Sequence, residues 1–200
     1  CVDFEIPSNW RALGWRMFIG KDFNYTPQAA VLIFVAPGMM YIYDEIYMEQ
    51  ANIEECCHMM KKLWYSKFGR PEAVICDKTR PDSVKSMRAH GIDEAVACKS
   101  DIVEDGVDLL NTLFNPVTLV TGGAVRPMIV VHKSNCTHTD WELREGYRRR
   151  IDKSGNATTI VGENNHYVDC ARYVAWETMR PWLRNIENAV PDAYVVGAGE

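Results

Sequence analysis

The chain has 200 residues, of which 47% are hydrophobic, 24% charged and 10% aromatic. This composition is typical of one globular domain that is large enough to bury its own core. Acidic residues outnumber basic residues, 27 to 22, so the formal net charge is −5. The acidic balance excludes a uniformly basic nucleic-acid-binding domain, but it does not exclude a local basic patch.

No part of the sequence approaches the roughly 18 apolar residues that a membrane span needs, and no stretch resembles a signal peptide. The seven cysteines lack the spacing of a disulfide framework or a zinc ribbon. We therefore expect free thiols in a reducing compartment. Because the chain starts at Cys1 and not at a methionine, we expect it to be a piece of a longer protein.

Three apolar runs predict an antiparallel meander at the start of the domain. They cover residues 15–20, 29–36 and 39–46, and Pro37-Gly38 forms a turn signal between the second and the third. Helical spacing over residues 52–68 then predicts one buried face, made of Ile53, Cys57, Met60, Leu63 and Trp64.

Short strands and helices alternate in the rest of the chain. Strands are predicted over residues 73–76, 94–98 and 128–132, and helices over 81–90, 100–114 and 136–147. Two short strands around a turn at 153–156 and a last helix from 164 or 165 to about 179, stopped by Pro181, complete the pattern. This order predicts an α/β fold with a mixed central sheet, in which an antiparallel three-strand meander is followed by parallel strands and helices flank the sheet. We expect a linker over 1–13, the domain over 14–180 and a tail over 181–200.

Three aspartates stand where a site at a sheet edge would draw its ligands. Asp22 ends the first strand, Asp77 follows the fourth, and Asp169 lies in the first turns of the last helix. If the strands of Asp22 and Asp77 are parallel and adjacent, both aspartates face the crevice where open α/β sheets bind ligands. Three converging carboxylates hold protons or cations, and oxygen ligands favour Mg²⁺ or Mn²⁺ over zinc. Taken singly, each aspartate is more typical of a turn or a cap, and spacing alone does not bring them together.

Five segments form an ordered set of motifs. They are Gly20-Lys-Asp22-Phe-Asn-Tyr-Thr-Pro27, Tyr41-Ile-Tyr-Asp-Glu45, Ile75-Cys-Asp77-Lys-Thr-Arg-Pro81, Ala97-Cys-Lys99 and Asn165-His166-Tyr-Val-Asp169-Cys-Ala-Arg172-Tyr173. Together they resemble the nuclease domain of the large terminase subunit of tailed bacteriophages. The resemblance extends over residues 14–176, and the last segment is its most specific part.

This resemblance implies an RNase H-like fold and an endodeoxyribonuclease that cuts concatemeric double-stranded viral DNA by two-metal hydrolysis with Mg²⁺ or Mn²⁺. It carries three metal-binding carboxylates onto Asp22, Asp77 and Asp169, with Asp22 as the bridging ligand. It also places His166 at the edge of the metal site, although a capping or structural histidine is an equal alternative. A fourth carboxylate, Asp44 or Glu45, remains open, and Asp44 is better interpreted as the end of an exposed strand.

The resemblance also implies partners: viral double-stranded DNA, the ATPase motor half of the same polypeptide, the terminase small subunit and the portal protein. The resemblance further implies that no membrane is involved and that the place of action is the cytoplasm of the infected bacterial host. The chain has no G-x-x-x-x-G-K-[ST] loop, so we expect the motor half to be absent here and ATP not to bind.

The candidate DNA contacts are basic residues that either grip phosphates or form a solvated face balanced by nearby acids. They are Lys99, Arg144, Arg148, Arg149, Arg150 and Lys153. Two other functions stay open at this point. One is another RNase H-like nuclease such as a resolvase, which would prefer branched DNA, and the other is a non-catalytic docking module of the packaging motor.

Overall fold

The computed structural model describes residues 1–24, 26–99, 102–115, 127–146, 149–151, 154, 157–160 and 165–189. At residues 146, 149–151, 157–160 and 186–189 it describes the backbone only. Of the predicted elements, the opening of the helix at Ser100 and Asp101 and most of the turn at 153–156 lie outside the described residues.

A six-stranded mixed sheet forms the centre of the molecule, in the order β5-β4-β1-β2-β3-β6. The predicted antiparallel meander consists of β1 (Arg16–Asp22), β2 (Gln28–Ala36) and β3 (Met39–Met48). Parallel strands extend it on both sides: β4 (Ala73–Cys76) beside β1, β5 (Ala95–Ala97) beside β4, and β6 (Ile129–Val131) beside β3. The predicted α/β fold with a mixed sheet is therefore confirmed.

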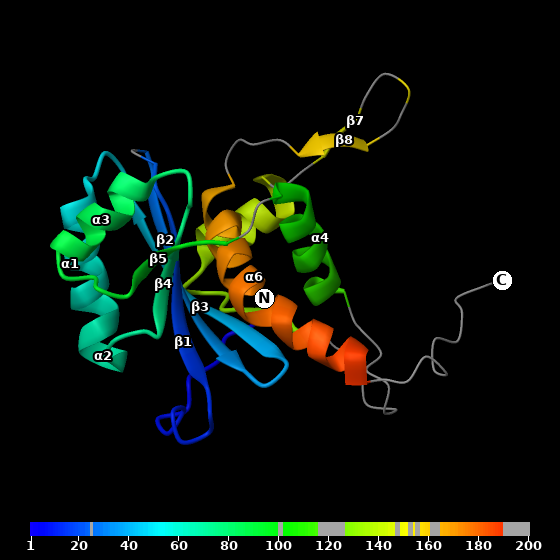
Figure 1. Cartoon of the computed structure of the whole chain (residues 1–200), viewed down its shortest axis with the longest axis horizontal. Helices are drawn as coiled ribbons and strands as arrows, with labels where there is room; N and C mark the ends of the chain where they lie inside the picture. The colour runs from blue at the N-terminus through cyan, green and yellow to red at the C-terminus, as the bar shows by residue number, and fades with distance from the viewer. Residues whose placement is uncertain are drawn as a thin grey trace.

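Helices cover both faces of this sheet (Figure 1). One face carries α1 (Ile53–Met60), which continues through a π-helical turn (Lys61–Tyr65) into α2 (Ser66–Phe68), and α3 (Pro81–Ala89). The other face carries α4 (Val103–Phe114), α5 (Thr137–Trp141), a second π-helical turn (Glu142–Gly146) and α6 (His166–Ala189). The strands β7 (Arg149–Ile151) and β8 (Ala157–Ile160) pair with each other, apart from the central sheet.

The alternation of side chains along β1 assigns its residues to two cores. Met17 and Ile19 pack beneath α1 and α3, whereas Phe18 packs beneath α4 and α6. Because successive side chains of a strand point to opposite faces, Asp22 lies on the face of Phe18 and Lys21 lies on the face of Ile19. The side chains of Lys21 and Asp22, at the end of β1, therefore lie on opposite faces of the sheet.

The prediction that Pro181 stops the last helix is wrong. Helix α6 continues through Pro181 to Ala189. Trp182 and Leu183, which follow the proline, pack against the core on the α4 and α6 side. Burial of these two side chains outweighs the helical hydrogen bond that proline cannot donate.

The predicted buried face of the helix after Asn52 is wrong at one position. Asn52 caps α1 through its side chain, and Trp64 is buried, but Leu63 is 41% exposed. The cause is the π-helical turn at Lys61–Tyr65, which widens the helix and shifts the later residues out of the 3.6-residue spacing.

The domain boundaries at 13/14 and 180/181 stay predictions. Within the segment expected to be a linker, Trp10 is buried, Phe4 packs edge-on against Tyr41, and Val2 forms an isolated bridge with His132. All seven cysteines are free thiols, as predicted. Within the described residues, no helix has the length and hydropathy to cross a membrane.

Candidate metal centre

The ends of β1 and β4 bring Asp22 and Asp77 to the same edge of the sheet. The two strands are parallel neighbours, and Lys21 pairs with Cys76. The backbone N–H of Asp77 donates to the carbonyl of Lys21 at 3.1 Å. The strands of Asp22 and Asp77 are thus parallel and adjacent, as a shared site requires. Both aspartates lie at the carboxyl ends of these strands, where α/β sheets bind ligands.

Helix α6 reaches this edge because Gly20 has no side chain. A Cβ on Gly20 would lie 2.1 Å from the carbonyl oxygen of Cys170 and 2.6 Å from its carbonyl carbon. Since Cys170 follows Asp169, this backbone contact places Asp169 next to the end of β1. Sequence reasoning missed the role of Gly20, although a glycine inside a strand is a signal for close backbone approach.

Asp22 is held by two side chains from different parts of the chain. Its Oδ2 lies 3.0 Å from Nδ1 of His166 and accepts a hydrogen bond from Nδ2 of Asn24. The hydrogen bond with Asp22 raises the pKa of His166, and this effect opposes the burial of the imidazole. His166 therefore contacts the carboxylate that ends β1, across the interface between sheet and helix.

Asp169 pairs with Arg172 one turn later on α6. Nε of Arg172 donates to Oδ1 of Asp169 at 2.9 Å, and both side chains are largely buried. Burial raises the pKa of Asp169, the charge of Arg172 lowers it, and the nearby charge of Asp22 raises it again. Asp22 and Asp169 are thus close enough to repel each other.

Asp77 completes the group. It lines a cavity of about 240 Å³ together with Asp169 and Tyr173. The N–H and hydroxyl of Thr79 donate to its carboxylate at 2.9 and 2.6 Å. Burial raises the pKa of Tyr173, and so do the charges of Asp169, Asp22 and Asp77. All three carboxylates are therefore close enough to the buried phenol of Tyr173 to raise its pKa.

The chemistry of these donors fits a hard divalent cation. Three carboxylates supply oxygen ligands, which Mg²⁺ and Mn²⁺ prefer. In the structure each carboxylate accepts hydrogen bonds from protein groups, and within the described parts of the chain no three His, Cys, Asp or Glu side chains are grouped closely enough to hold an ion. Metal binding therefore requires the three carboxylates to move closer together.

Glu142 is a buried carboxylate that sequence reasoning missed. Its Oε2 accepts hydrogen bonds from the backbone N–H of Tyr167 at 2.7 Å and of Val168 at 2.9 Å. The side chain is 3% exposed, and burial raises its pKa to about 7 although these hydrogen bonds lower it. Glu142 thereby caps the helix that carries Asp169, from a position far away in the sequence.

Neither open candidate for a fourth carboxylate joins the three aspartates. Glu45 accepts hydrogen bonds from the backbone N–H of His138 and Thr139 and from the Thr139 hydroxyl, so it caps α5. Asp44 accepts a hydrogen bond from the indole N–H of Trp64 at 2.8 Å. Its interpretation as the end of an exposed strand is wrong, since burial raises the pKa of Asp44 and it lies within β3.

The candidate DNA contacts are only partly described. Lys99 is 86% exposed and lies 3.6 Å from Glu177, and Arg144 is paired with Asp140 at 2.9 Å. Arg149 and Arg150 belong to β7, where the backbone alone is described. Arg148 and Lys153 lie outside the described residues. A role for these residues in DNA binding stays a prediction.

Comparison with solved structures finds similar folds in one group of proteins. The nuclease domain of the large terminase of bacteriophage SPP1, solved with bound Mn, matches 86% of this chain and 92% of its own length, with 20% identity and a TM-score of 0.64. The P22 large terminase nuclease domain matches 93% of this chain and 91% of its own, with 18% identity and a TM-score of 0.64.

The large terminase of a thermophilic bacteriophage matches 90% of this chain, with 17% identity and a TM-score of 0.61. The chain spans 42% of that protein. Comparisons with protein-family models and with curated proteins gave no match. The chain thus has the RNase H-like fold of the nuclease domains of phage large terminases, as the sequence motifs predict.

Proposed function

We propose that this chain is a metal-dependent endonuclease domain of a viral DNA-packaging terminase. The observation that carries the proposal is the convergence of Asp22, Asp77 and Asp169 at one sheet edge, within the fold of terminase nuclease domains. The substrate is double-stranded viral DNA in concatemeric form, and the reaction is hydrolysis of its phosphodiester bonds.

In this proposal Asp22, Asp77 and Asp169 would hold two Mg²⁺ or Mn²⁺ ions, and Asp22 would be a ligand to both. When bound, the ions supply Lewis-acid stabilisation of the negative charge that develops on the phosphate. His166 and Asn24 orient the Asp22 carboxylate through its Oδ2. Arg172 fixes Asp169 and offsets part of the negative charge at this edge.

The finer parts of the proposal concern partners. The large terminase of the thermophilic bacteriophage, 42% of which this chain spans, was also solved in complex with ADP and with ATP-gamma-S. We infer that the present domain works beside an ATPase motor half, with a small subunit and a portal protein, in the cytoplasm of an infected bacterium. The motor supplies DNA movement, and this domain supplies the cut.

The test is cleavage of a supercoiled plasmid and of linear duplex DNA in Mn²⁺, with the wild-type domain and with Asp77→Asn. We expect nicking and linearisation by the wild type only. The matched control is Asp93→Asn, which removes the same charge at an exposed position away from the site. It should cut like the wild type.

Two results would contradict the proposal. Cutting by Asp77→Asn at the wild-type rate would exclude Asp77 from the reaction. Strong preference for a branched four-way junction over linear duplex would favour a resolvase.

A further inference from the structure

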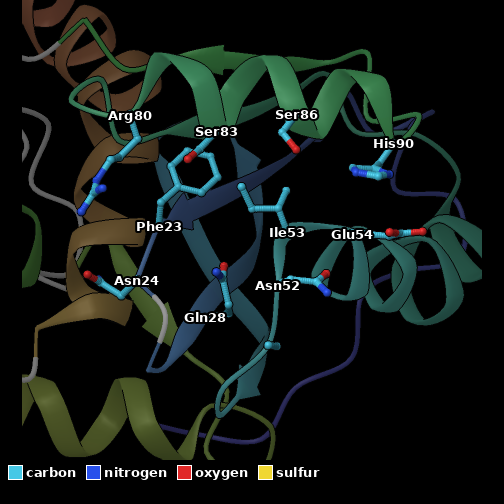
Figure 2. Close-up of a pocket in the computed structure, with 11 residues that line it drawn as sticks. Phe23, Asn24, Gln28, Asn52, Ile53, Glu54, Arg80, Ser83, Ser86 and His90 are labelled. Atoms are coloured by element: carbon cyan, nitrogen blue, oxygen red, sulfur yellow. The ribbon is translucent and has the colours of Figure 1, made fainter.

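A second pocket, of about 510 Å³, opens on the other side of β1, between α1 and α3 (Figure 2). It is separate from the cavity lined by Asp77 and Asp169. Asn24 connects the two, because it lines this pocket and donates a hydrogen bond to Asp22. Whatever binds in this pocket therefore lies next to the metal centre.

The floor of the pocket contains a buried amide that lacks one partner. Gln28 is 5% exposed, and its side-chain oxygen accepts a hydrogen bond from Nζ of Lys21 at 2.6 Å. Figure 2 shows the amide end of Gln28 directed into the pocket. Among the residues that the structure describes, no acceptor pairs with its Nε2. Since buried donors are nearly always paired, this N–H group indicates that a ligand acceptor belongs here.

Two basic side chains, Lys21 and Arg80, lie near Gln28 on the side of the metal centre. Lys21, which donates to Gln28, is fully buried, and its ammonium also donates to the backbone carbonyl of Asp22. Arg80, at the start of α3, lies at the same end of the pocket as Asn24 (Figure 2). Within the described residues its guanidinium has no acidic partner. The acid that lines the pocket, Glu54, lies at the opposite end.

We propose that this end of the pocket binds a backbone phosphate of the DNA strand that extends from the metal centre. Arg80 is the main ligand, because a guanidinium presents paired N–H donors that match phosphate oxygens. The amide of Gln28 and the hydroxyl of Ser83 supply further donors. Such a contact positions the strand without reading its sequence. This inference rests on the proposed function, since it takes DNA as the substrate.

The test is binding of a fluorescein-labelled duplex of about 20 base pairs, long enough to cover a domain of this size, measured by anisotropy in EDTA over a range of NaCl concentrations. Each phosphate contact contributes a slope of ~0.9 to the dependence of log K on log [salt]. We therefore expect Arg80→Ala to lower that slope by about one and to raise the Kd about eightfold at ~0.1 M salt.

Lys85→Ala is the matched control. It removes one positive charge from the same helix, but Lys85 is exposed and does not line the pocket. We expect it to change the Kd by less than about twofold, because distant exposed charges are screened by salt. Circular dichroism establishes that both variants fold, so a difference between them reports the contact itself.

Equal Kd values and equal salt slopes for Arg80→Ala and Lys85→Ala would overturn the proposal. A free nucleotide is the other possible source of a phosphate. Binding of a deoxynucleoside monophosphate to the wild type and not to Arg80→Ala, with unchanged duplex affinity in that variant, would also overturn it. Because the titrations contain EDTA, they remain readable if the domain proves unable to cut DNA in Mn²⁺.

Discussion

The carbonyl oxygen of Cys170 occupies the space in which a side chain of Gly20 would begin, 2.1 Å from the ideal Cβ position. Helix α6 therefore rests on β1 through direct backbone contact. Asp22 lies two residues after this contact on the strand, and Asp169 lies one residue before it on the helix. The relative position of the two carboxylates depends on the absence of one methyl group.

Gly20→Ala should displace α6 from β1, because backbone atoms cannot move aside as a flexible side chain can. We expect a loss of about 3 kcal/mol in the free energy of unfolding, typical of an overpacked core, measured by urea denaturation. We also expect Mn²⁺-dependent cleavage to fall by at least about tenfold, since small misplacements at catalytic sites have effects of this size.

The control for this variant is Gly91→Ala. Gly91 has a φ of +81°, so alanine there costs about 1 kcal/mol in backbone strain, but the nearest atom to its Cβ would be the Lys61 ammonium nitrogen at 3.6 Å, an ordinary van der Waals contact. Cleavage should stay at the wild-type rate. Full activity of Gly20→Ala would show that this contact does not set the site.

Glu142 predicts a pH dependence of stability in metal-free buffer. Its pKa is raised from an ordinary 4.5 to about 7, so the folded state binds a proton that the unfolded state has released. The free energy of unfolding should therefore fall as the pH rises from about 4.5 to 7, by an amount on the order of 3 kcal/mol. Urea denaturation at several pH values measures this change.

Glu142→Gln is the matched variant, because it keeps an acceptor for α6 and cannot titrate. Between pH 4.5 and 7, the free energy of unfolding of Glu142→Gln should fall less than that of the wild type, by about 3 kcal/mol. Glu142→Ala should cost about 2 kcal/mol at pH 5, since it removes the acceptor of two buried N–H groups. If the free energy of unfolding of the wild type and of Glu142→Gln changed identically with pH, Glu142 would not be the source of this pH dependence.

Asp169 and Asp77 should differ in what their removal does to stability. Asp169→Ala takes away the carboxylate that pairs with the buried guanidinium of Arg172, and breaking such a pair costs about 3 kcal/mol. Asp77→Ala removes the acceptor of the hydrogen bonds from Thr79, which costs about 1 kcal/mol. Thermal unfolding in EDTA separates the two. Equal losses of stability in the two variants would contradict the claim that Asp169 stabilises the buried guanidinium of Arg172.

Asp44→Asn should stabilise the protein at pH 7. Burial raises the pKa of Asp44, so its charge opposes folding once the carboxyl ionises, and the asparagine oxygen can still accept from Trp64. The advantage over the wild type should shrink as the pH falls through the raised pKa of folded Asp44 toward its ordinary value of 3.8, because the carboxyl is then neutral in both states. DNA cleavage in Mn²⁺ should be unchanged, and a loss of cleavage would place Asp44 in the site.

The strands and the two strand-end aspartates could be predicted because their signals are local. Apolar runs mark β1 and β4, and a polar residue at the end of each run identifies Asp22 and Asp77. Nothing in the spacing joins Asp169 to them. The ordered motifs alone, through their resemblance to one family, predict that link.

The features that the sequence did not reveal depend on contacts between distant segments. Glu142 caps α6, and Glu45 caps α5, but neither cap residue is adjacent to its helix in the sequence. The packing of Trp182 after Pro181 likewise overrides a local stop signal. In each case the favourable free energy comes from burial or hydrogen bonding across the fold, which a local pattern does not encode.

The central claim is that Asp22, Asp77 and Asp169 together bind divalent metal. The most direct test is a crystal of this domain soaked in Mn²⁺, with anomalous diffraction used to locate the ions. We predict anomalous peaks at the shared edge of β1, β4 and α6, with carboxylate oxygens of all three aspartates at ~2.1–2.2 Å, close to the distances typical of such hard cations. Mn²⁺ bound elsewhere, or no peak at this edge, would contradict the account.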